Sequence, residues 1–390
     1  TDAHVNRITT IWVEVPYFPY TIPITLTVDE ILSANIDEIN DINPDFVIDT
    51  GDIADFADEG HYERYLQVLD PLNNSSIAVY TVPGNHDRRK WVAWPSSPEN
   101  LKYYNDIIKP HRPACTYLIS PNNYTFRHKR VLFIGLDSGE DFSWVDSTPE
   151  GSGLEPEQIS ELEGLPDKVI PKIIFMHHPA INDDDDLTWK DDAPGGNDAC
   201  IAHNRWDFIN YTKDNNVSLV LTGHTHTGRV FDADGDPVFG NVWRKSLWPL
   251  FIQTPSITLD AERHGYREFY VKADRIEQTY HRHGNYNYMK AIIGSPATLH
   301  AFDSLGKHTG INLSSDKTER DIPRSFYFSE YTFETINEAN ETVNETMPEK
   351  IILYNISDNY LFQIIANLTE EQKLSPEIEH FNLTVERQTT

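Results

Sequence analysis

The chain has 390 residues and a formal net charge of −29, from 32 Lys and Arg against 61 Asp and Glu. Like charge over the whole surface disfavours a nucleic-acid backbone or an anionic membrane as a partner. With 39% hydrophobic and 12% aromatic residues the composition excludes a disordered chain, and no apolar run approaches the roughly 20 residues that a membrane span needs.

The first two-thirds of the chain predicts alternating helices and strands. Apolar residues at helical spacing predict a helix over Thr27–Asn40, and Asn43-Pro44 breaks it. Short apolar runs that end in turn residues then predict strands, with amphipathic helices between them. In chain order we expect a strand at 46–48, a helix at 61–69, strands at 77–82 and 131–136, a helix at 155–162, a strand at 169–176, a helix at 201–212 and a strand at 219–222. Beyond Arg229 the pattern predicts strands only, at 251–252, 266–271 and 276–280.

The C-terminal part of the chain has a different pattern. Its apolar residues alternate or run together at 326–333, 350–355, 361–366 and 381–386, with polar stretches between. This pattern favours a small antiparallel β domain. We place the boundary between 276 and 294, and predict a first domain over 1–283 and a β-sandwich-like domain over 290–390.

Four of the predicted strands end in residues of the kinds that bind metal ions. These residues are Asp52, Asn85, His177, His224 and His226. Ligand sites in α/β folds form at such carboxyl ends of strands. Imidazole, carboxylate and amide oxygen suit zinc, iron or manganese. Two ions about 3.5–4 Å apart would need a bridging carboxylate, for which Asp52 is the candidate.

These strand ends also resemble a known family. The strings TGDIAD (50–55), PGNHD (83–87), FMHHPA (175–180) and TGHTH (222–226) look like the signature blocks of the calcineurin-like metallophosphoesterases. Their order and spacing match too, and the resemblance covers about residues 1–280. The family's further block, Asp-x-His, fits Asp2-Ala3-His4. The strand that should hold this block is absent here. We therefore expect a processed or trimmed chain whose terminus frays, and a coincidental match is the alternative.

The resemblance implies two divalent or trivalent metal ions of the iron, zinc or manganese class, together with their ligands. The first ion would take Asp2, His4, Asp52 and His226, and the second Asp52, Asn85, His177 and His224. His86 would be the catalytic histidine, stabilising charge on the phosphate or protonating the leaving oxygen. Asp55 resembles the carboxylate that orients this histidine, although a plain turn or cap role stays open. His178 is expected behind the ligands. Arg88 and Arg89 could contact phosphate, but surface positions are the favoured interpretation.

The same resemblance implies the fold and the reaction. The fold would be a four-layer α/β-β/α sandwich, followed here by the C-terminal antiparallel β domain. The reaction would be hydrolysis of a small phosphate monoester or diester, by in-line attack of a hydroxide that bridges the two ions. No covalent intermediate is needed, and the net charge opposes a nucleic-acid substrate.

The number of N-x-S/T sequons bears on location. Asparagine and Ser/Thr frequencies predict roughly four sequons, whereas the chain has eleven. They begin at Asn73, Asn74, Asn123, Asn210, Asn216, Asn312, Asn340, Asn344, Asn355, Asn367 and Asn382. The excess favours an N-glycosylated, secreted or cell-surface protein, and unused sequons are the alternative. No signal peptide is visible, so a secreted chain would be in processed form. Cys115 and Cys200 leave open one disulfide or two thiols.

One acidic segment could affect substrate choice. Residues 181–199 carry seven aspartates and Trp189, and should overhang the site. A solvated acidic loop is one interpretation. The other is that the segment receives a cation, such as calcium or a choline leaving group over the indole ring of Trp189.

An interpretation from another class remains open beside the enzyme. The chain could be a glycosylated cell-surface or structural protein that uses this fold as a scaffold and assembles through its C-terminal β domain. The ligand set and His86 favour the enzyme, because a scaffold has no chemical reason to keep them.

Overall fold

A computed structural model of the chain describes residues 2–5, 8–14, 21–89, 101–118, 122–139, 153–165, 169–182, 200–258, 265–282, 288–293, 297–312, 317–322, 325–328, 331–336, 342–347, 349–354, 361–366 and 383–388. The chain divides into two compact units. The first comprises Thr1–Ile11, Ile24–Asn35 and Ile39–His283, and the second comprises Trp12–Pro23, Ile36–Glu38 and Gly284–Thr390. The division is therefore not contiguous along the chain.

A seven-stranded mixed sheet forms the centre of the first unit. Its spatial order is β10 (Val230–Asp232), β12 (Leu250–Gln253), β9 (Val217–Thr222), β8 (Lys172–Phe175), β7 (Val131–Gly135), β6 (Tyr124–His128) and β5 (Thr116–Tyr117). The strands β12, β9, β8 and β7 run parallel, and the outer strands pair antiparallel. Side chains alternate between two hydrophobic cores, one on each face, which is why these strands are continuously apolar in sequence.

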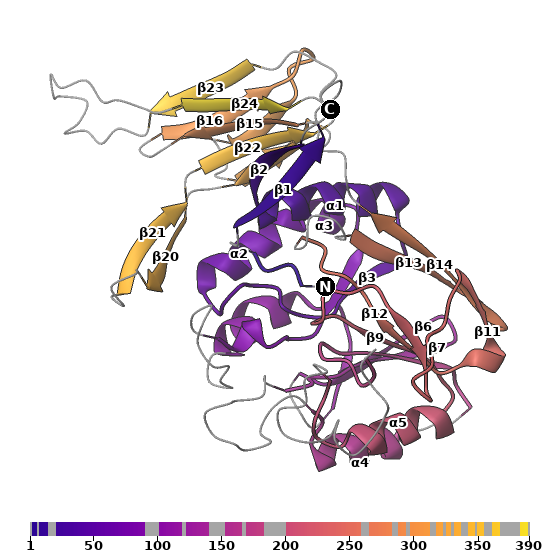
Figure 1. Cartoon of the computed structure of the whole chain (residues 1–390). Helices are drawn as coiled ribbons and strands as arrows, with labels where there is room; N and C mark the ends of the chain where they lie inside the picture. The colour runs from indigo at the N-terminus through magenta and orange to yellow at the C-terminus, as the bar shows by residue number, and fades with distance from the viewer. Residues whose placement is uncertain are drawn as a thin grey trace, which may run out of the picture. The chain divides into compact units, whose positions relative to one another are not determined.

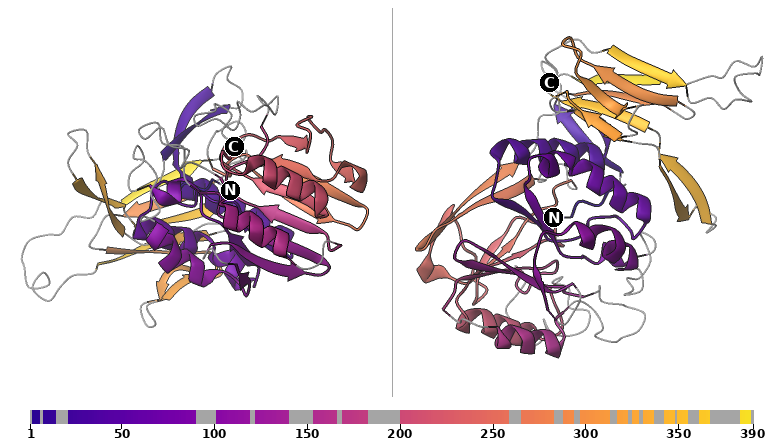
Figure 2. Two further views of the ribbon diagram at one scale, coloured as in Figure 1. Left: turned by 90° about the horizontal axis from the view of Figure 1, so that it is seen from below. Right: turned by 180° about the vertical axis from the view of Figure 1, so that it is seen from behind.

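Two helices cover one face of this sheet. They are α4 (Pro156–Gly164) and α5 (Arg205–Asp214), which lie side by side in Figures 1 and 2. Their apolar residues, including Leu162 and Phe208, share a buried cluster with Ile134 and Ile174 of the sheet. A capping box begins α4, because the Gln158 side chain accepts the backbone N–H of Glu155 at 2.6 Å.

The parallel pair β3 (Phe46–Asp49) and β4 (Ala78–Thr81) packs on the other face of the sheet. Tyr80 stacks on Phe126 with ring centroids 3.6 Å apart, and Phe46 meets the edge of the same Phe126 ring. A three-stranded antiparallel sheet of β11 (Val242–Arg244), β14 (Arg275–Arg282) and β13 (Gly265–Val271) joins this core through Trp243 and Ile276. The seven-stranded sheet is therefore buried between helices on one side and strands on the other.

Three helices lie next to β3 and β4 in chain order. They are α1 (Val28–Ile42), α2 (Glu59–Val68) and α3 (Asp70–Asn74). The positions that predicted α1 are all buried: Val28, Ile31, Leu32, Ile36 and Ile39. The helix ends where Asn43 takes a left-handed φ of 54° just before Pro44. No described helix is both long and apolar enough to cross a bilayer.

The second unit is built from antiparallel strands. One four-stranded sheet has the order β19 (Ser325–Phe328), β22 (Glu349–Tyr354), β15 (Tyr288–Ile293) and β24 (Leu383–Gln388). The other has the order β18 (Lys317–Arg320), β17 (His308–Asn312), β16 (Ala297–Phe302) and β23 (Leu361–Ala366). Ala291 and Leu353 of the first sheet share one buried cluster with Leu299 and Ala301 of the second. A further pair is β20 (Tyr331–Ile336) and β21 (Thr342–Met347).

The structure confirms the predicted helices and most predicted strands, with one correction. The run 326–333 is not one strand, because β19 ends at Phe328 and β20 begins at Tyr331 in a different sheet. Other strands are not predicted at all. They are the two-stranded sheet of β1 (Ile8–Glu14) and β2 (Thr21–Thr27), together with β5, β6, β10, β11, β15, β16, β17, β18 and β21. Cys115 and Cys200 are not joined by a disulfide.

Candidate metal centre

Residues 2–5 lie parallel to the segment that follows β3. Their backbone N–H groups donate to carbonyl oxygens at 2.9 Å each, from Asp2 to Gly51, from His4 to Asp52 and from Val5 to Ile53. The Ser256 hydroxyl donates to the Asp2 carbonyl at 2.7 Å. Asp2 and His4 are fully buried, so the fraying expected for this block is not observed.

The predicted ligands have unusual backbone conformations. Five of the predicted ligands are non-glycine residues with a positive φ: Asp2 (52°), His4 (44°), Asp52 (54°), His224 (66°) and His226 (53°). For a residue other than glycine this backbone conformation is strained by on the order of 1–3 kcal/mol. It persists only where the surrounding structure enforces it. The strain therefore concentrates where the sequence predicts a functional site.

Two glycines let the turns after β3 and β4 touch. A Cβ on Gly84 would lie 2.2 Å from Oδ1 of Asp52, and a Cβ on Gly51 would lie 2.7 Å from the backbone nitrogen of Gly84. We expect Gly84→Ala to displace the Asp52 carboxylate and to lower the free energy of unfolding by about 1–3 kcal/mol. Urea titration measures the loss of stability, with Gly164→Ala as control because that Cβ meets nothing within 4 Å. Equal stability of the two variants would contradict this packing.

The buried carboxylate of Asp87 ties the same two turns together. It accepts backbone N–H groups from Gly84 at 2.8 Å and from Ile53 and Ala54 at 3.3 Å each. The Tyr62 hydroxyl donates to it at 3.1 Å. Burial, and then the negative charge of Asp52, raise the pKa of Asp87 to about 7. Sequence analysis gave Asp87 no role, because these contacts depend on which turns meet in the fold.

The first predicted ligand group lies together. Ligand atoms of Asp2, His4 and His226 all lie within 4.8 Å of one another. The His226 Nε2 atom is 3.5 Å from Oδ1 of Asp2, and the His4 Nε2 atom is 3.6 Å from Oδ2 of Asp52.

The second predicted ligand group lies beside the first. The His177 Nε2 atom is 2.8 Å from Oδ1 of Asn85 and 3.2 Å from Oδ2 of Asp52. The imidazole of His224 lies with its centroid 5.1 Å from that of His177. The carboxylate of Asp52 thus lies between the two groups, as a bridging ligand would.

The histidines are oriented by their second nitrogens. Nδ1 of His177 donates to the carbonyl oxygen of Thr50 at 2.9 Å, which directs Nε2 to Asp52. Nδ1 of His4 lies 3.2 Å from Oδ1 of Asp55. Metal-binding histidines commonly hold a carbonyl or carboxylate in this way, because it fixes the tautomer and the ring.

Electrostatics in the centre follow from the buried carboxylates. Burial acts to raise the pKa of Asp52, but the neighbouring histidines outweigh it and hold that pKa well below its usual range. Burial acts to lower the pKa of His177, but the charge on Asp52 outweighs it and raises that pKa to about 9. The field at the centre therefore favours positive charge.

Asp55 contacts both His4 and His86, which refines its predicted role. Its carboxylate Oδ1 lies closer to Nδ1 of His4, at 3.2 Å, than to Nδ1 of His86, at 3.6 Å. Nδ1 of His86 instead donates to the backbone carbonyl of Asp55 at 2.7 Å. The carboxylate therefore positions His4 at least as directly as it positions His86.

We expect Asp55→Ala to weaken metal binding about 10- to 100-fold, the usual cost of losing a group that orients a ligand. The backbone carbonyl that holds His86 survives this substitution. Competition with a fluorescent chelator measures the change, with Asp106→Ala as an exposed control. Unchanged metal affinity would leave Asp55 with a turn or cap role.

Arg88 and His178 are two further predicted residues near the centre. Arg88 is buried, not on the surface, and its guanidinium pairs with the Asp137 carboxylate. His178 lies behind the ligands, with Nδ1 at 2.9 Å from the Ser138 hydroxyl, and its ring centroid is 4.5 Å from that of His224. Asp137 and Ser138 were missed, although they follow the predicted strand 131–136 as the other site residues follow theirs.

The predicted glycosylation sites have different surroundings. Asn123 is fully buried, with Oδ1 accepting the backbone N–H of Asp137 at 2.7 Å, so the prediction of a glycan there is wrong. The side chains of Asn73, Asn74 and Asn210 are exposed, and Asn216 is half-buried. The side chains of Asn312 and Asn344, all of Asn340, Asn355, Asn367 and Asn382, and the acidic residues 183–199 lie outside the described part.

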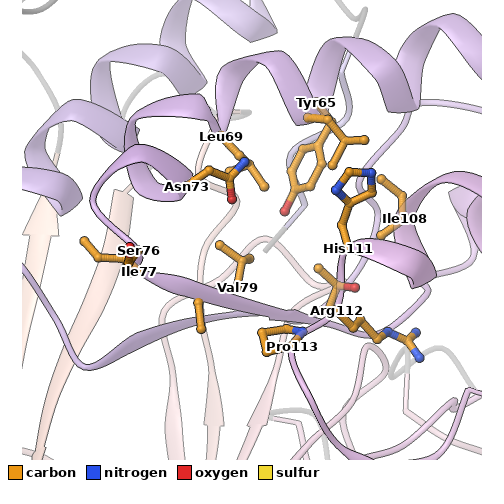
Figure 3. Close-up of a pocket in the computed structure, with 13 residues that line it drawn as sticks. Tyr65, Leu69, Asn73, Ser76, Ile77, Val79, Ile108, His111, Arg112 and Pro113 are labelled. Carbon is orange, nitrogen blue, oxygen red and sulfur yellow. The ribbon is translucent and has the colours of Figure 1, made fainter.

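A cavity of about 230 Å³ lies elsewhere, between α2, β4 and the segment 108–113. Figure 3 shows Tyr65, Asn73 and His111 around it, with the Arg112 guanidinium directed away. No predicted ligand lines it. The metal centre and this cavity are therefore separate features.

Comparisons with known proteins agree with the motifs. The family model for calcineurin-like phosphoesterases matches residues 27–228, more than half of the chain. A probable cyclic nucleotide phosphodiesterase of Xenorhabdus bovienii (strain SS-2004) is 24% identical over 196 residues, 48% of this chain and 63% of that protein. One of Coxiella burnetii (strain RSA 493 / Nine Mile phase I) is 28% identical over 193 residues, 47% of this chain and 60% of that protein. The chain thus spans less than two-thirds of these curated relatives.

Two solved structures show weaker similarity. A purple acid phosphatase from yellow lupin (Lupinus luteus) seeds aligns with a TM-score of 0.40 at 9% identity, over 82% of this chain and 54% of that one. A metallophosphoesterase from Sphaerobacter thermophilus aligns with a TM-score of 0.29 at 14% identity, over 65% and 84%. From the match over residues 27–228, this chain belongs to the calcineurin-like phosphoesterase family.

Proposed function

We propose that this chain hydrolyses small phosphate monoesters or diesters at a centre of two metal ions. The observation that carries the proposal is the position of Asp52. Its Oδ2 atom lies 3.6 Å from Nε2 of His4 and 3.2 Å from Nε2 of His177, which belong to the two predicted ligand groups. One carboxylate between two sets of imidazoles is the arrangement that a pair of ions requires.

The residues present fit such ions. Nδ1 of His4 lies 3.2 Å from the Asp55 carboxylate, which accepts its proton and leaves Nε2 with a lone pair. The Nε2 atom is buried without a hydrogen-bond partner, as suits a metal ligand. Asp2 and Asp52 are 0% and 1% exposed, and buried carboxylates need positive charge nearby. Imidazole with carboxylate favours zinc, iron or manganese over calcium or magnesium.

The chain's own groups would divide the work around these ions. When bound, two such ions would acidify water to supply the attacking hydroxide and would offset charge on the phosphoryl group. Asp2, His4 and His226 would hold one ion, while Asn85, His177 and His224 would hold the other. His86 lies against the first group, with its ring centroid 4.4 Å from that of His4, where it can contact the phosphoryl group or the leaving oxygen.

Both named relatives are probable cyclic nucleotide phosphodiesterases, which makes cyclic nucleotides the first diesters to try. Nucleic acids are poor candidates, because the net charge of −29 repels a polyanion. The test is hydrolysis of p-nitrophenyl phosphate, bis-p-nitrophenyl phosphate and cyclic AMP by protein reconstituted with Mn²⁺, Zn²⁺ or Fe²⁺. We expect turnover of at least one ester that a chelator abolishes. No turnover with any metal would contradict the proposal and favour a scaffold.

Location and organisation belong to the same proposal. The fold would have four layers. The helices beside β3 and β4 form the first, and the strands β3, β4, β11, β13 and β14 form the second. The seven-stranded sheet is the third layer, and α4 with α5 is the fourth.

We place the protein outside the cell, with glycans on exposed sequons such as Asn73 and Asn210. The C-terminal strands would form a separate domain over 290–390, which is available for self-assembly. Mass shifts after glycosidase treatment test the glycans.

A further inference from the structure

Gln253 lies between the two ends of the turn that carries His224 and His226. It is the last residue of β12, in register with Thr222 at the end of β9. Its backbone N–H and carbonyl groups pair with Arg229, where the chain returns from the turn, at 2.9 and 3.2 Å. Gln253 is 1% exposed. A buried residue that is not itself a predicted ligand is therefore placed where it can hold the turn.

The Gln253 side chain makes hydrogen bonds through both of its polar atoms. Oε1 accepts from the Thr225 and Thr227 hydroxyls at 2.8 Å each. Nε2 donates to the backbone carbonyl of Ile181 at 2.8 Å and to Oδ1 of Asn182 at 3.1 Å. A backbone carbonyl only accepts, so the amide nitrogen must face Ile181 and the amide oxygen must face the two hydroxyls. All four hydrogen-bonding positions of the amide are thus used, and its orientation is fixed.

The turn needs such support because its backbone is strained. His224 and His226 have positive φ angles of 66° and 53°. Strain of this kind persists only where the surrounding structure enforces it. Thr225 and Thr227 alternate with the two histidines along the chain, so the hydroxyls that Gln253 accepts lie next to both strained residues. These contacts therefore act on the backbone beside one predicted ligand of each ion.

The residues that follow Gln253 hold another part of the centre. The Ser256 hydroxyl donates to the Asp2 carbonyl at 2.7 Å, and the Thr258 hydroxyl donates to the Ala3 carbonyl at 2.9 Å. Asp2 also has a positive φ, of 52°. Both strained segments that carry ligands of the first ion are thus tied to the chain at and just after the end of β12.

We propose that Gln253 is a positioning residue for both metal ions, because its amide group holds the turn in the conformation that presents His224 and His226. This inference rests on the proposed function and adds the group that keeps its ligands in place. Gln253 does not bind an ion itself, because protein groups occupy all four hydrogen-bonding positions of its amide. It acts through the hydroxyls of Thr225 and Thr227.

Metal affinity tests the role of Gln253 without any ester. We expect Gln253→Leu to weaken binding of Mn²⁺ about 10- to 100-fold, the usual cost of losing a group that orients a ligand. Competition with a fluorescent chelator measures the change. Gln278→Leu is the matched control and should keep wild-type affinity, because the side chain of this other buried glutamine bonds Asn241 and Arg267 instead. Wild-type affinity in Gln253→Leu would overturn the inference, as would a wild type that binds no Mn²⁺.

The two hydroxyls provide a second set of variants, which carries the test even where Gln253→Leu does not fold. Thr225→Val with Thr227→Val removes both hydroxyls, and we expect the pair to weaken Mn²⁺ binding as Gln253→Leu does. Thr225→Ser with Thr227→Ser keeps the hydroxyls and should keep the affinity. Thr212→Val is the control, at a buried threonine of α5 whose hydroxyl donates to Ile209. Equal affinity of the valine pair and the serine pair would overturn the inference.

A combined variant separates positioning from a general loss of stability. Because Gln253 acts through the two hydroxyls, Gln253→Leu together with both valine substitutions should bind Mn²⁺ as weakly as Gln253→Leu alone. Additive losses of affinity would mean that these side chains contribute independently, which contradicts the inference.

Metal binding and ester hydrolysis together separate this role from the proposed function. Metal affinity that depends on Gln253, in a protein that hydrolyses no ester, refutes the proposed function alone. An active enzyme whose metal affinity is unchanged in Gln253→Leu refutes only the positioning role of Gln253.

Discussion

Asp52→Asn is expected to reduce the metal content from two ions per chain to at most one and to lower kcat/KM by about 10³-fold or more. Metal ions supply several kcal/mol of transition-state stabilisation, and each 1.36 kcal/mol is a factor of ten in rate. Asparagine keeps an oxygen that can accept the backbone N–H of His86, which Oδ1 of Asp52 accepts at 2.8 Å. The turn should therefore survive, while the negative charge between the two ligand groups is lost. Elemental analysis and ester hydrolysis measure the two effects.

The control for this experiment is Asp45→Asn, which makes the same chemical change in an exposed side chain paired with Lys129. Circular dichroism and thermal unfolding should show both variants folded. A folded Asp52→Asn protein that retains two ions and wild-type activity would exclude a bridging role for Asp52.

His86→Ala is the second large expected effect. We expect a loss of about 10²- to 10⁴-fold in kcat, which is the range for a positioned proton donor or acceptor. The metal content should not change, because His86 contacts Arg89 and the carbonyl of Asp55 and is not in the predicted ligand set. Burial, the largest influence, lowers the pKa of His86 to about 4, so the imidazole is neutral in the metal-free protein at pH 7.

Kinetics and elemental analysis of His86→Ala belong together, with His111→Ala as a control at an exposed histidine. Loss of metal together with activity would mean that His86 supports the ions rather than the reaction. Full activity would show that another group performs its role.

The sequence predicted which residues form the site better than it predicted which residues contact one another there. Strand ends place Asp52 and Asn85 at one edge because β3 and β4 are parallel, and that rule needs no tertiary information. His177 follows β8 of the other sheet, so its meeting with them depends on how the two sheets pack. The sequence offered no comparable rule for Asp87. Its role depends on which turns touch, as the close approach of Gly84 to Asp52 shows.

Fold prediction failed for two different reasons. The strand β5 has two residues, too few for an alternating pattern. The strand β2 does alternate, with Ile22, Ile24 and Leu26 two residues apart, and this signal was overlooked. The error over 326–333 is of the second kind, because Ser329 and Glu330 interrupt the apolar residues where the chain changes sheet between Phe328 and Tyr331. Burial of Asn123 could not be foreseen either, since a sequon reports composition and not exposure.

The central claim is that two ions share the Asp52 carboxylate. Electron paramagnetic resonance of the protein loaded with two equivalents of Mn²⁺ tests it most directly, because spins that share a bridge couple to each other. We predict an exchange-coupled dimanganese signal in the wild type, replaced in Asp52→Asn by the six-line spectrum of isolated Mn²⁺. Only isolated Mn²⁺ in the fully loaded wild type would contradict a shared carboxylate.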